Sequence, residues 1–231
     1  MTENYKTRLA AATMAALSML LGADTAMGSA YDTNNNSRVE YSKLENNLQV
    51  REGELSKENF TAKWRQAVDE GINGIIFSGT TIGEEAAQAI AEQISDGSIT
   101  SLFFQKYYIK SEAIRIVLAA CCAPGARVRS FGIENERFSD DSPNNPLITD
   151  EEAGLIANLL RTSHYLEGIT IAGTALTDDG AEVITEGLKS SPSLQVFNFL
   201  SNSKVTPAGL KRLRDIVNSK GLSKAHVDIR D

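Results

Sequence analysis

Side chains able to do nucleophilic or acid–base chemistry are few in this chain of 231 residues. It has two histidines, His164 and His226, and two adjacent cysteines, Cys121 and Cys122. No motif places a nucleophile beside either histidine, and no glycine-rich phosphate loop carries the lysine that such a loop needs. Cys121 falls at an apolar position of a repeating pattern, so we expect it to be buried and unreactive. The sequence therefore predicts that the protein is not an enzyme.

Metal binding has one weak candidate in the sequence. Asp32, Asn34 and Asn36 place oxygen ligands at the first, third and fifth positions of a loop that resembles the start of an EF-hand or dockerin loop. The sixth position, which needs glycine, is Ser37, and the twelfth, which needs a bidentate carboxylate, is Lys43. The cysteine spacing does not suit zinc. We therefore expect neither a metal nor a cofactor.

Charge and composition narrow the class of partner. The chain is 42% hydrophobic and 23% charged, with a formal net charge of −7 and an isoelectric point near 5.0. An acidic chain repels phosphate backbones, so we do not expect nucleic-acid binding. The one basic group, at Lys211, Arg212 and Arg214 with Lys220 and Lys224 beyond it, is interpreted as the solvated face of a last helix.

Residues 1–30 differ from the rest of the chain. A short start with two basic residues precedes an uncharged run from Leu9 to Ala23, and small residues follow up to Ala30. This order is typical of a secretory signal peptide cleaved after Ala30, and the run is too short and alanine-rich for a transmembrane helix. The alternative is a helix that caps the fold, or a disordered leader. We predict a secreted or extracytoplasmic protein with no stable membrane span in its mature form, and a cytoplasmic protein as the alternative.

An internal repeat dominates the rest of the sequence. Three segments, starting at Ile72, Ile99 and Leu166, place apolar residues at offsets 0, 3, 5, 10, 18 and 22. Two further copies start at Val128 and Leu194; the first has a polar insert of about ten residues, 139–147, and the second has one extra residue. Offsets 0 to 5 predict a short strand, and offsets 18 and 22 predict the inward face of a helix. One unit cannot bury its apolar face alone, but stacked units can.

Turn chemistry agrees with this repeat. Thr149 and Thr177 precede acidic residues that suit the first turn of a helix, and Thr206 precedes a proline at a first helical position. Offset 14 holds a small residue, glycine at Gly180, which lets the helix approach the strand layer closely. These features predict where the helices of the repeat begin.

Atypical units flank the repeats, as is expected of a stacked array. Residues 48–55 predict an imperfect first strand and turn, and residues 222–227 predict a last strand with no helix after it. Residues 31–47 are polar and rich in asparagine, and we interpret them as a linker or an N-terminal cap. The predicted repeat domain therefore covers residues 48–231.

The segment LEGITIAGTALTDDG, from Leu166 to Gly180, resembles a leucine-rich repeat of the ribonuclease-inhibitor type. The resemblance covers residues 45–230 and implies an α/β solenoid: a short horseshoe with parallel strands on its concave face and helices on its convex face. In that family offset 8 holds Asn or Cys, which bonds the turning backbone, and here only Asn202 does so. The other copies carry Thr80, Tyr107, Glu136 and Thr174 there. The departure implies looser turns.

In such a solenoid, side chains at offsets 2, 4, 6 and 7 point outward from the concave surface. Most are small or polar, but Phe103 and three aliphatic residues are not, and apolar groups on an exposed face favour a protein contact. The predicted partner-binding residues are Ile76, Phe103, Gln105, Glu134, Thr170, Val196, Asn198, Leu200 and His226. The alternative is that the N-terminal segment or linker folds over them. We predict a monomeric, non-catalytic module that binds a protein of unknown identity through its concave face.

Two other functions are compatible with repeats of this type. Ran GTPase-activating proteins use the same repeat, so a cytoplasmic regulator of a GTPase is the alternative function, although the acidic tail of that family is missing. Bacterial ubiquitin-ligase effectors join such repeats to a cysteine domain, for which the residues outside the repeats leave no room. Both alternatives rest on analogy of fold.

Overall fold

The computed structural model describes residues 40–44, 46–51, 53–105, 108–109, 111–134, 148–222 and 224–227. Strands and helices alternate along these residues. The elements are β1 (Glu40–Leu44), β2 (Asn47–Arg51), β3 (Glu54–Leu55), α2 (Lys57–Asp69), β4 (Gly74–Ser78), β5 (Thr81–Ile82), α3 (Glu84–Ser95), β6 (Ser101–Gln105), β7 (Tyr108–Ile109), α4 (Ser111–Cys121), β8 (Ser130–Glu134), α5 (Asp150–Thr162), β9 (Gly168–Ala172), α6 (Asp178–Lys189), β10 (Val196–Leu200), α7 (Pro207–Ser219) and β11 (Lys224–Val227).

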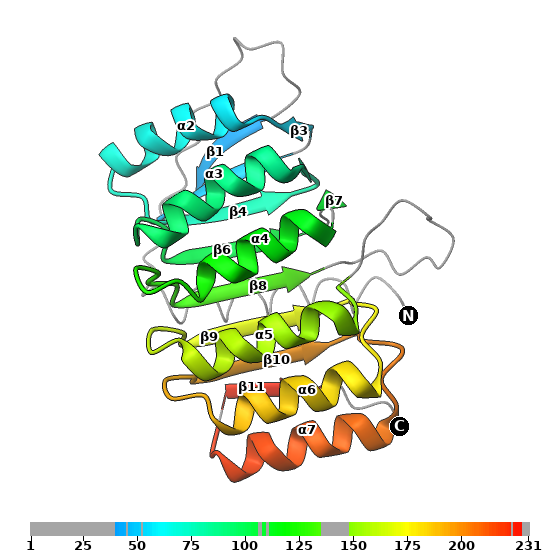
Figure 1. Ribbon diagram of the computed structural model, residues 1–231. Helices are drawn as coiled ribbons and strands as arrows, with labels where there is room; N and C mark the ends of the chain where they lie inside the picture. Colours follow the sequence, from blue (N-terminus) through cyan, green and yellow to red (C-terminus); the bar gives the residue numbers. More distant parts are fainter. Residues whose placement is uncertain are drawn as a thin grey trace.

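One eight-stranded sheet carries the fold, in the order β1-β2-β4-β6-β8-β9-β10-β11. Every neighbouring pair from β2 to β11 is parallel, and β1 pairs with β2 in the antiparallel sense. Helices α2 to α7 all lie on one side of this sheet (Figure 1). The predicted alternation of strands and helices around a parallel sheet is thus confirmed, and it is compatible with a solenoid. A small second sheet, β3-β5-β7, joins the turns that follow three of the strands.

The core lies between the sheet and the helices. Alternate side chains of a strand point to opposite faces, so the apolar residues at offsets 3 and 5 of each repeat share the helix side. Phe77 stacks on Phe104 with ring centroids 5.3 Å apart, and Phe104 meets Phe131 edge-on at 6.2 Å. Trp64 on α2 is buried, and its indole Nε1 donates to Ser98 Oγ at 3.2 Å. The predicted core positions are buried because stacked repeats cover one another's apolar faces.

The helices begin where the turn chemistry predicted. Thr149, Thr177 and Thr206 are the N-cap residues of α5, α6 and α7, and each side chain accepts a hydrogen bond from a backbone N–H of the first turn. Thr149 also forms a reciprocal capping box with Glu152, whose carboxylate accepts from the Thr149 N–H at 2.9 Å. Pro207 occupies the first position of α7.

The flanking units are also visible in the structure. β2 includes the predicted first strand, and β11 is the predicted last strand, which pairs with β10. β1 lies within residues 31–47 and adds an antiparallel strand beside β2 at the edge of the sheet. The predicted leader 1–30, the candidate calcium ligands from Asp32 to Asn36 and the insert 139–147 lie outside the described residues.

Candidate functional site

The sheet has a second face that points away from the helices. In β4, Ile75 and Phe77 belong to the core, whereas Gly74, Ile76 and Ser78 alternate with them and face the other way. We call this side the distal face, and it consists of the first, third and fifth residues of β2, β4, β6, β8, β9 and β10, with the matching residues of β11. Its central row is held in register across the sheet as Gln49, Ile76, Phe103, Gly132, Thr170, Asn198 and His226.

All nine partner-binding residues predicted from the sequence lie at distal-face positions. Five stand in the central row, on β4, β6, β9, β10 and β11: Ile76, Phe103, Thr170, Asn198 and His226. Gln105, Glu134 and Leu200 are the fifth residues of their strands, and Val196 is the first residue of β10. The backbone of His226 is placed by its register, while its side chain lies outside the description. The sheet therefore brings the predicted set onto one surface.

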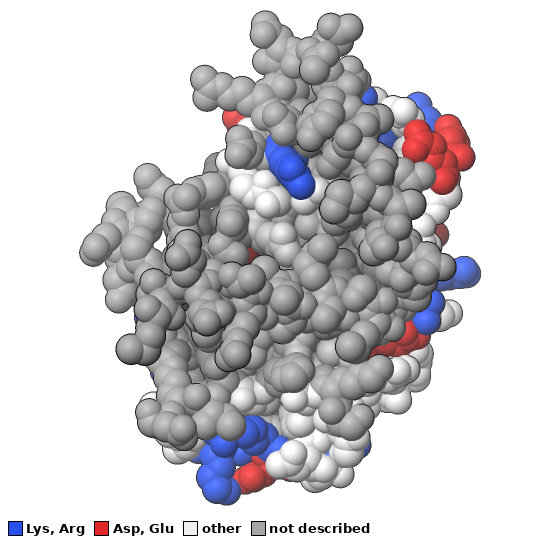
Figure 2. Space-filling model, turned by 180° about the vertical axis from the view of Figure 1, so that it is seen from behind, with Lys and Arg blue, Asp and Glu red and all other residues white. Residues whose placement is uncertain are grey.

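The centre of the distal face is buried, whereas the predicted protein contact favoured an exposed face and left a buried one as the alternative. Ile76 and Phe103 are each 3% exposed and Val196 is 6% exposed, whereas Gln105 and Leu200 are half-buried. The Phe103 ring leans over Gly132 on the next strand, so that a Cβ on that glycine would overlap the ring. Figure 2 views this side of the molecule, where most of the visible described atoms are uncharged. The apolar centre of this face is thus buried in the structure.

Two buried amide oxygens on the distal face have no hydrogen-bond partner in the structure. Asn198 donates from Nδ2 to Thr170 Oγ1 at 3.2 Å, but its Oδ1 accepts nothing. Asn47, at the first position of β2, is 1% exposed, and its Oδ1 lies over Gly74 without a donor. Buried acceptors without a donor are rare in folded proteins, so these atoms suit a bound N–H or O–H group. Sequence reasoning missed Asn47 because it stands in the cap, where no repeat copy was recognised.

A polar hollow of about 170 Å³ lies beside the N-terminal ends of the strands. Its lining comes from successive repeats: Asn46, Asn73, Thr100, Ser101, Arg129, Ser130 and Glu167. Arg129 Nη2 and Glu167 Oε1 are 2.6 Å apart, so the strongest charges of the hollow neutralise each other. The backbone carbonyls of Asn73 and Thr100 accept from the next strand. The hollow therefore holds no free charge that would select a ligand.

The side chains that could do nucleophilic, acid–base or metal chemistry are dispersed over the described part of the structure. Burial raises the pKa of the Cys121 thiol, and the neighbouring Cys122 raises it further; the half-buried Cys122 also has a raised pKa because of burial. A raised pKa disfavours the thiolate, which is the reactive form. His164 is exposed in the turn before β9. Within the described ranges no three His, Cys, Asp or Glu residues are grouped to hold a metal, and no helix is long and apolar enough to cross a membrane.

Neither a protein-family model nor a curated protein matches this chain. Fold alone does not imply function, so the function must follow from the groups on the distal face. That face combines small, polar and apolar side chains, and two of its buried amide oxygens have no hydrogen-bond donor.

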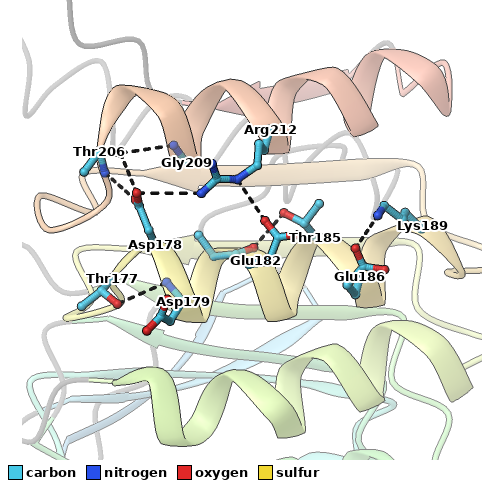
Figure 3. A network of polar contacts seen from close by, with 11 residues as sticks. Thr177, Asp178, Asp179, Glu182, Thr185, Glu186, Lys189, Thr206, Gly209 and Arg212 are labelled. Atoms are coloured by element: carbon cyan, nitrogen blue, oxygen red, sulfur yellow. Dashed lines mark hydrogen bonds and ion pairs between the residues drawn. The ribbon is translucent and has the colours of Figure 1, made fainter.

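Carboxylates on the helix side connect successive repeats. Asp178, at the start of α6, accepts from the N–H of Thr206 at 2.7 Å and from its hydroxyl at 2.6 Å (Figure 3). Asp150, one repeat earlier, accepts from the N–H and hydroxyl of Thr177 at 2.9 and 2.6 Å. Arg212 also approaches Asp178 at 3.8 Å. Each aspartate thus holds the N-cap of the next helix, and this cross-repeat role was not evident in the sequence.

The Asp178 contact predicts a pH-dependent part of the stability. Hydrogen bonds from Thr206 lower the pKa of Asp178, and Arg212 lowers it further. A lowered folded-state pKa means that the contribution is present above the unfolded-state pKa, about 4, and is lost as pH falls through the folded-state value. We expect Asp178→Asn to reduce the free energy of unfolding by about 1 kcal/mol at neutral pH, with the deficit shrinking below pH ~4.

Urea unfolding of the two proteins, followed by Trp64 fluorescence at several pH values, measures this deficit. Asp179→Asn is the matched control, because Asp179 is exposed in the same helical turn. If Asp178→Asn lowered the free energy of unfolding by the same amount at all pH values, the charge of the Asp178 carboxylate would not contribute to stability.

Proposed function

We propose that this chain is a non-catalytic, leucine-rich-repeat protein-binding module that takes up its partner on the distal face, the concave face of the solenoid. The observation that carries the proposal is the register of the central row, which gathers the predicted residues on one surface. An apolar centre at Ile76 and Phe103 is accompanied there by the unpaired oxygens of Asn47 and Asn198. Apolar anchors with a few polar groups that fix orientation are typical of protein recognition.

The turn contacts support the leucine-rich-repeat assignment within this proposal. Asn202 donates from Nδ2 to the carbonyl of Ile171 in the preceding repeat at 3.1 Å, and its Oδ1 accepts from the Thr174 N–H at 3.0 Å. Thr80 occupies the same offset and its hydroxyl donates to the equivalent carbonyl, that of Val50, at 3.2 Å. Threonine can therefore replace asparagine in bonding the backbone of the previous repeat, which argues against looser turns at this position.

The size of the face indicates the kind of partner. Seven parallel strands at about 4.8 Å spacing span about 29 Å, and five residues of strand span about 16 Å. The product, roughly 460 Å², is smaller than the ~800 Å² that each side of a standard interface buries. A single helix or an extended segment of a protein fits such a surface better than a whole globular domain.

Charge placed on the distal face tests the proposal. Gln105 and Leu200 are half-buried there, so Gln105→Glu with Leu200→Glu adds two carboxylates without emptying the core. Val183→Glu on α6 is the matched control, because that side chain is 40% exposed on the helix side. The immobilised protein and both variants are incubated with extract and medium of the producing cells, and bound proteins are identified by mass spectrometry.

We expect the distal variant to lose a specific partner by about tenfold or more, because a carboxylate buried against an apolar group is costly. The control should retain that partner, and the thermal unfolding of the three proteins should be similar. A partner that the distal variant keeps and the Val183→Glu variant loses would place the binding surface on the helices instead.

A further inference from the structure

Two buried hydroxyl groups line the polar hollow beside the N-terminal ends of the strands. Ser101 is 2% exposed and Ser130 is 6% exposed, and both residues belong to the lining of the hollow. Neither hydroxyl forms a hydrogen bond with any residue that the structure describes. Buried polar groups nearly always have a hydrogen-bond partner in the protein or in ordered water. The hollow must therefore supply the partners of both serines, as water or as a ligand.

An ion pair between two repeats forms the more exposed part of the lining. Arg129 Nε and Nη2 both donate to Glu167 Oε1, at 3.0 and 2.6 Å. Arg129 Nη1 and Glu167 Oε2 form no hydrogen bond with the described residues, so one donor group and one acceptor remain. Because the two charges cancel, a charged ligand is attracted by one partner and repelled by the other. The pair therefore favours a neutral group that both donates and accepts.

Backbone hydrogen bonds fix the strand starts beneath the hollow. The Asn73 carbonyl accepts from the Thr100 N–H at 2.7 Å, and the Thr100 carbonyl accepts from the Arg129 N–H at 2.7 Å. Ser101 on β6 and Ser130 on β8 are register partners, and neighbouring strands lie about 4.8 Å apart. One small molecule can thus contact both hydroxyls without a change in the backbone, and groups that are already in position bind a ligand at lower cost.

The volume of the hollow limits the size of its ligand. At about 170 Å³ it has the space of about six water molecules, and it is smaller than the roughly 300 Å³ at which pockets for drug-sized ligands begin. A molecule with several hydroxyl groups can replace such a cluster of waters, because a hydroxyl donates and accepts as water does. Size and hydrogen bonding together favour a single sugar ring or a smaller polyol.

We propose that the hollow binds a neutral polyol, of the size of one sugar residue, between the two serines and the ion pair. The hydroxyls of the ligand bond to Ser101 and Ser130, accept from Arg129 Nη1 and donate to Glu167 Oε2. This site goes beyond the proposed function, because its ligand is a small molecule or a sugar residue and its lining excludes the predicted partner-binding residues. With so few contacts, the dissociation constant is expected in the millimolar range.

NMR chemical shifts of the backbone amides in the full-length chain test the proposal, with glucose as the probe. We expect glucose to shift the amide signals of Ser101, Ser130 and Glu167 and to saturate with one millimolar dissociation constant. Cyclohexanol, a ring of similar size with one hydroxyl, should bind at least about tenfold more weakly, because it lacks the other hydrogen bonds. If glucose shifts none of these signals, or if cyclohexanol binds equally well, the inference is overturned.

Charged sugars test the role of the ion pair. Glucuronate adds a carboxylate and glucosamine an ammonium group to the same ring, and both should bind more weakly than glucose. Glu167→Gln leaves Arg129 without its counter-charge, so in this variant the affinity for glucuronate should rise about tenfold relative to glucose. If the unaltered chain prefers either charged sugar, or if Glu167→Gln leaves the ratio of the two affinities unchanged, the ligand does not contact the ion pair as proposed.

Removal of the serine hydroxyls locates the ligand. Ser101→Ala with Ser130→Ala should weaken glucose binding about tenfold, because two hydrogen bonds are lost. Ser78→Ala is the matched control, since Ser78 is a half-buried residue at the far end of β4 and does not line the hollow. It should bind glucose as the unaltered chain does, and the amide spectra show that both variants are folded. Equal glucose binding by the two variants would exclude the serines from the site.

A free polyol and the terminal sugar of a glycan offer the same chemistry, and albumin carrying attached glucose separates them. Retention of this albumin, but not of bare albumin, by the immobilised chain assigns the glycan; glucose binding without retention assigns the free polyol. The proposed function fails separately. If glucose does not bind and the distal charges still abolish partner capture, only the polyol site is wrong. If glucose binds and capture ignores those charges, only the partner-binding face is wrong.

Discussion

Replacing Gly187 by alanine is expected to destabilise the protein by about 2–4 kcal/mol. Gly187 lies in α6 where this helix packs closely against α5. A Cβ there would stand 2.6 Å from Ala157 Cα and 2.7 Å from the Ala157 carbonyl oxygen. Backbone atoms cannot rotate away as the end of a side chain can. The two helices would have to separate, which opens the core beneath them.

The matched control is Gly154→Ala in the adjacent helix α5. A Cβ at Gly154 meets nothing within 4 Å, so only the intrinsic preference of alanine for helix operates, and we expect stabilisation by up to about 1 kcal/mol. Urea unfolding followed by Trp64 fluorescence gives both values. If Gly187→Ala were as stabilising as Gly154→Ala, the close packing of α6 against α5 at Gly187 would be contradicted.

Removing the side chain of Asn202 is expected to cost about 2–4 kcal/mol. Asn202 is 1% exposed, and it bonds the Ile171 carbonyl, the Thr174 N–H and the Thr174 hydroxyl, the last at 2.6 Å. Asn202→Ala leaves these groups buried without partners, and a buried unpaired group loses its water without compensation. The loss should appear in thermal and urea unfolding.

Asn218→Ala provides the comparison for this prediction. Asn218 is exposed on α7, so its replacement should change the free energy of unfolding by less than about 0.5 kcal/mol. Asn202→Thr is a second, more informative variant, because Thr80 bonds the equivalent carbonyl with a hydroxyl. We expect it to recover part of the loss. Equal stability of Asn202→Ala and Asn218→Ala would contradict the turn geometry.

The strands, the register and the helix starts could be predicted from the sequence because they depend on local pattern. Apolar offsets define which side chains of a strand face the helices, and stacking fixes how neighbouring strands align. The threonines at 149, 177 and 206 mark helix starts through side-chain bonds within a few residues. Placement of the distal residues followed from the same alternation.

Contacts between repeats could not be predicted in the same way. The glycine at offset 14 was interpreted as allowing a helix to approach the sheet, but a Cβ at Gly180 would overlap the Asp150 carboxylate of the preceding repeat. That carboxylate is present because it holds the N-cap Thr177. A pattern within one repeat does not reveal which side chain of the neighbour fills a space.

Whether the distal face is exposed or buried could not be decided from the sequence, and the cause is physical. Alternation predicts which way Phe103 points, but not what lies beyond it. Burial depends on residues distant in sequence, and Gly132, which makes room for the Phe103 ring because it has no Cβ, carries no signal of its own. Asn47 was missed for a related reason, since its role depends on its position over Gly74 on the next strand.

Hydroxyl-radical footprinting of the protein, with and without the captured partner, tests the central claim most directly. Oxidation is measured by mass spectrometry at Leu200 on the distal face, at Val183 on α6 and at Tyr165 in the turn before β9; the last two are 40% and 50% exposed. If the partner binds the distal face, oxidation of Leu200 falls when the partner is added and oxidation of Val183 and Tyr165 does not change. Protection of Val183 or Tyr165 with no change at Leu200 would contradict the claim that this face is the binding surface.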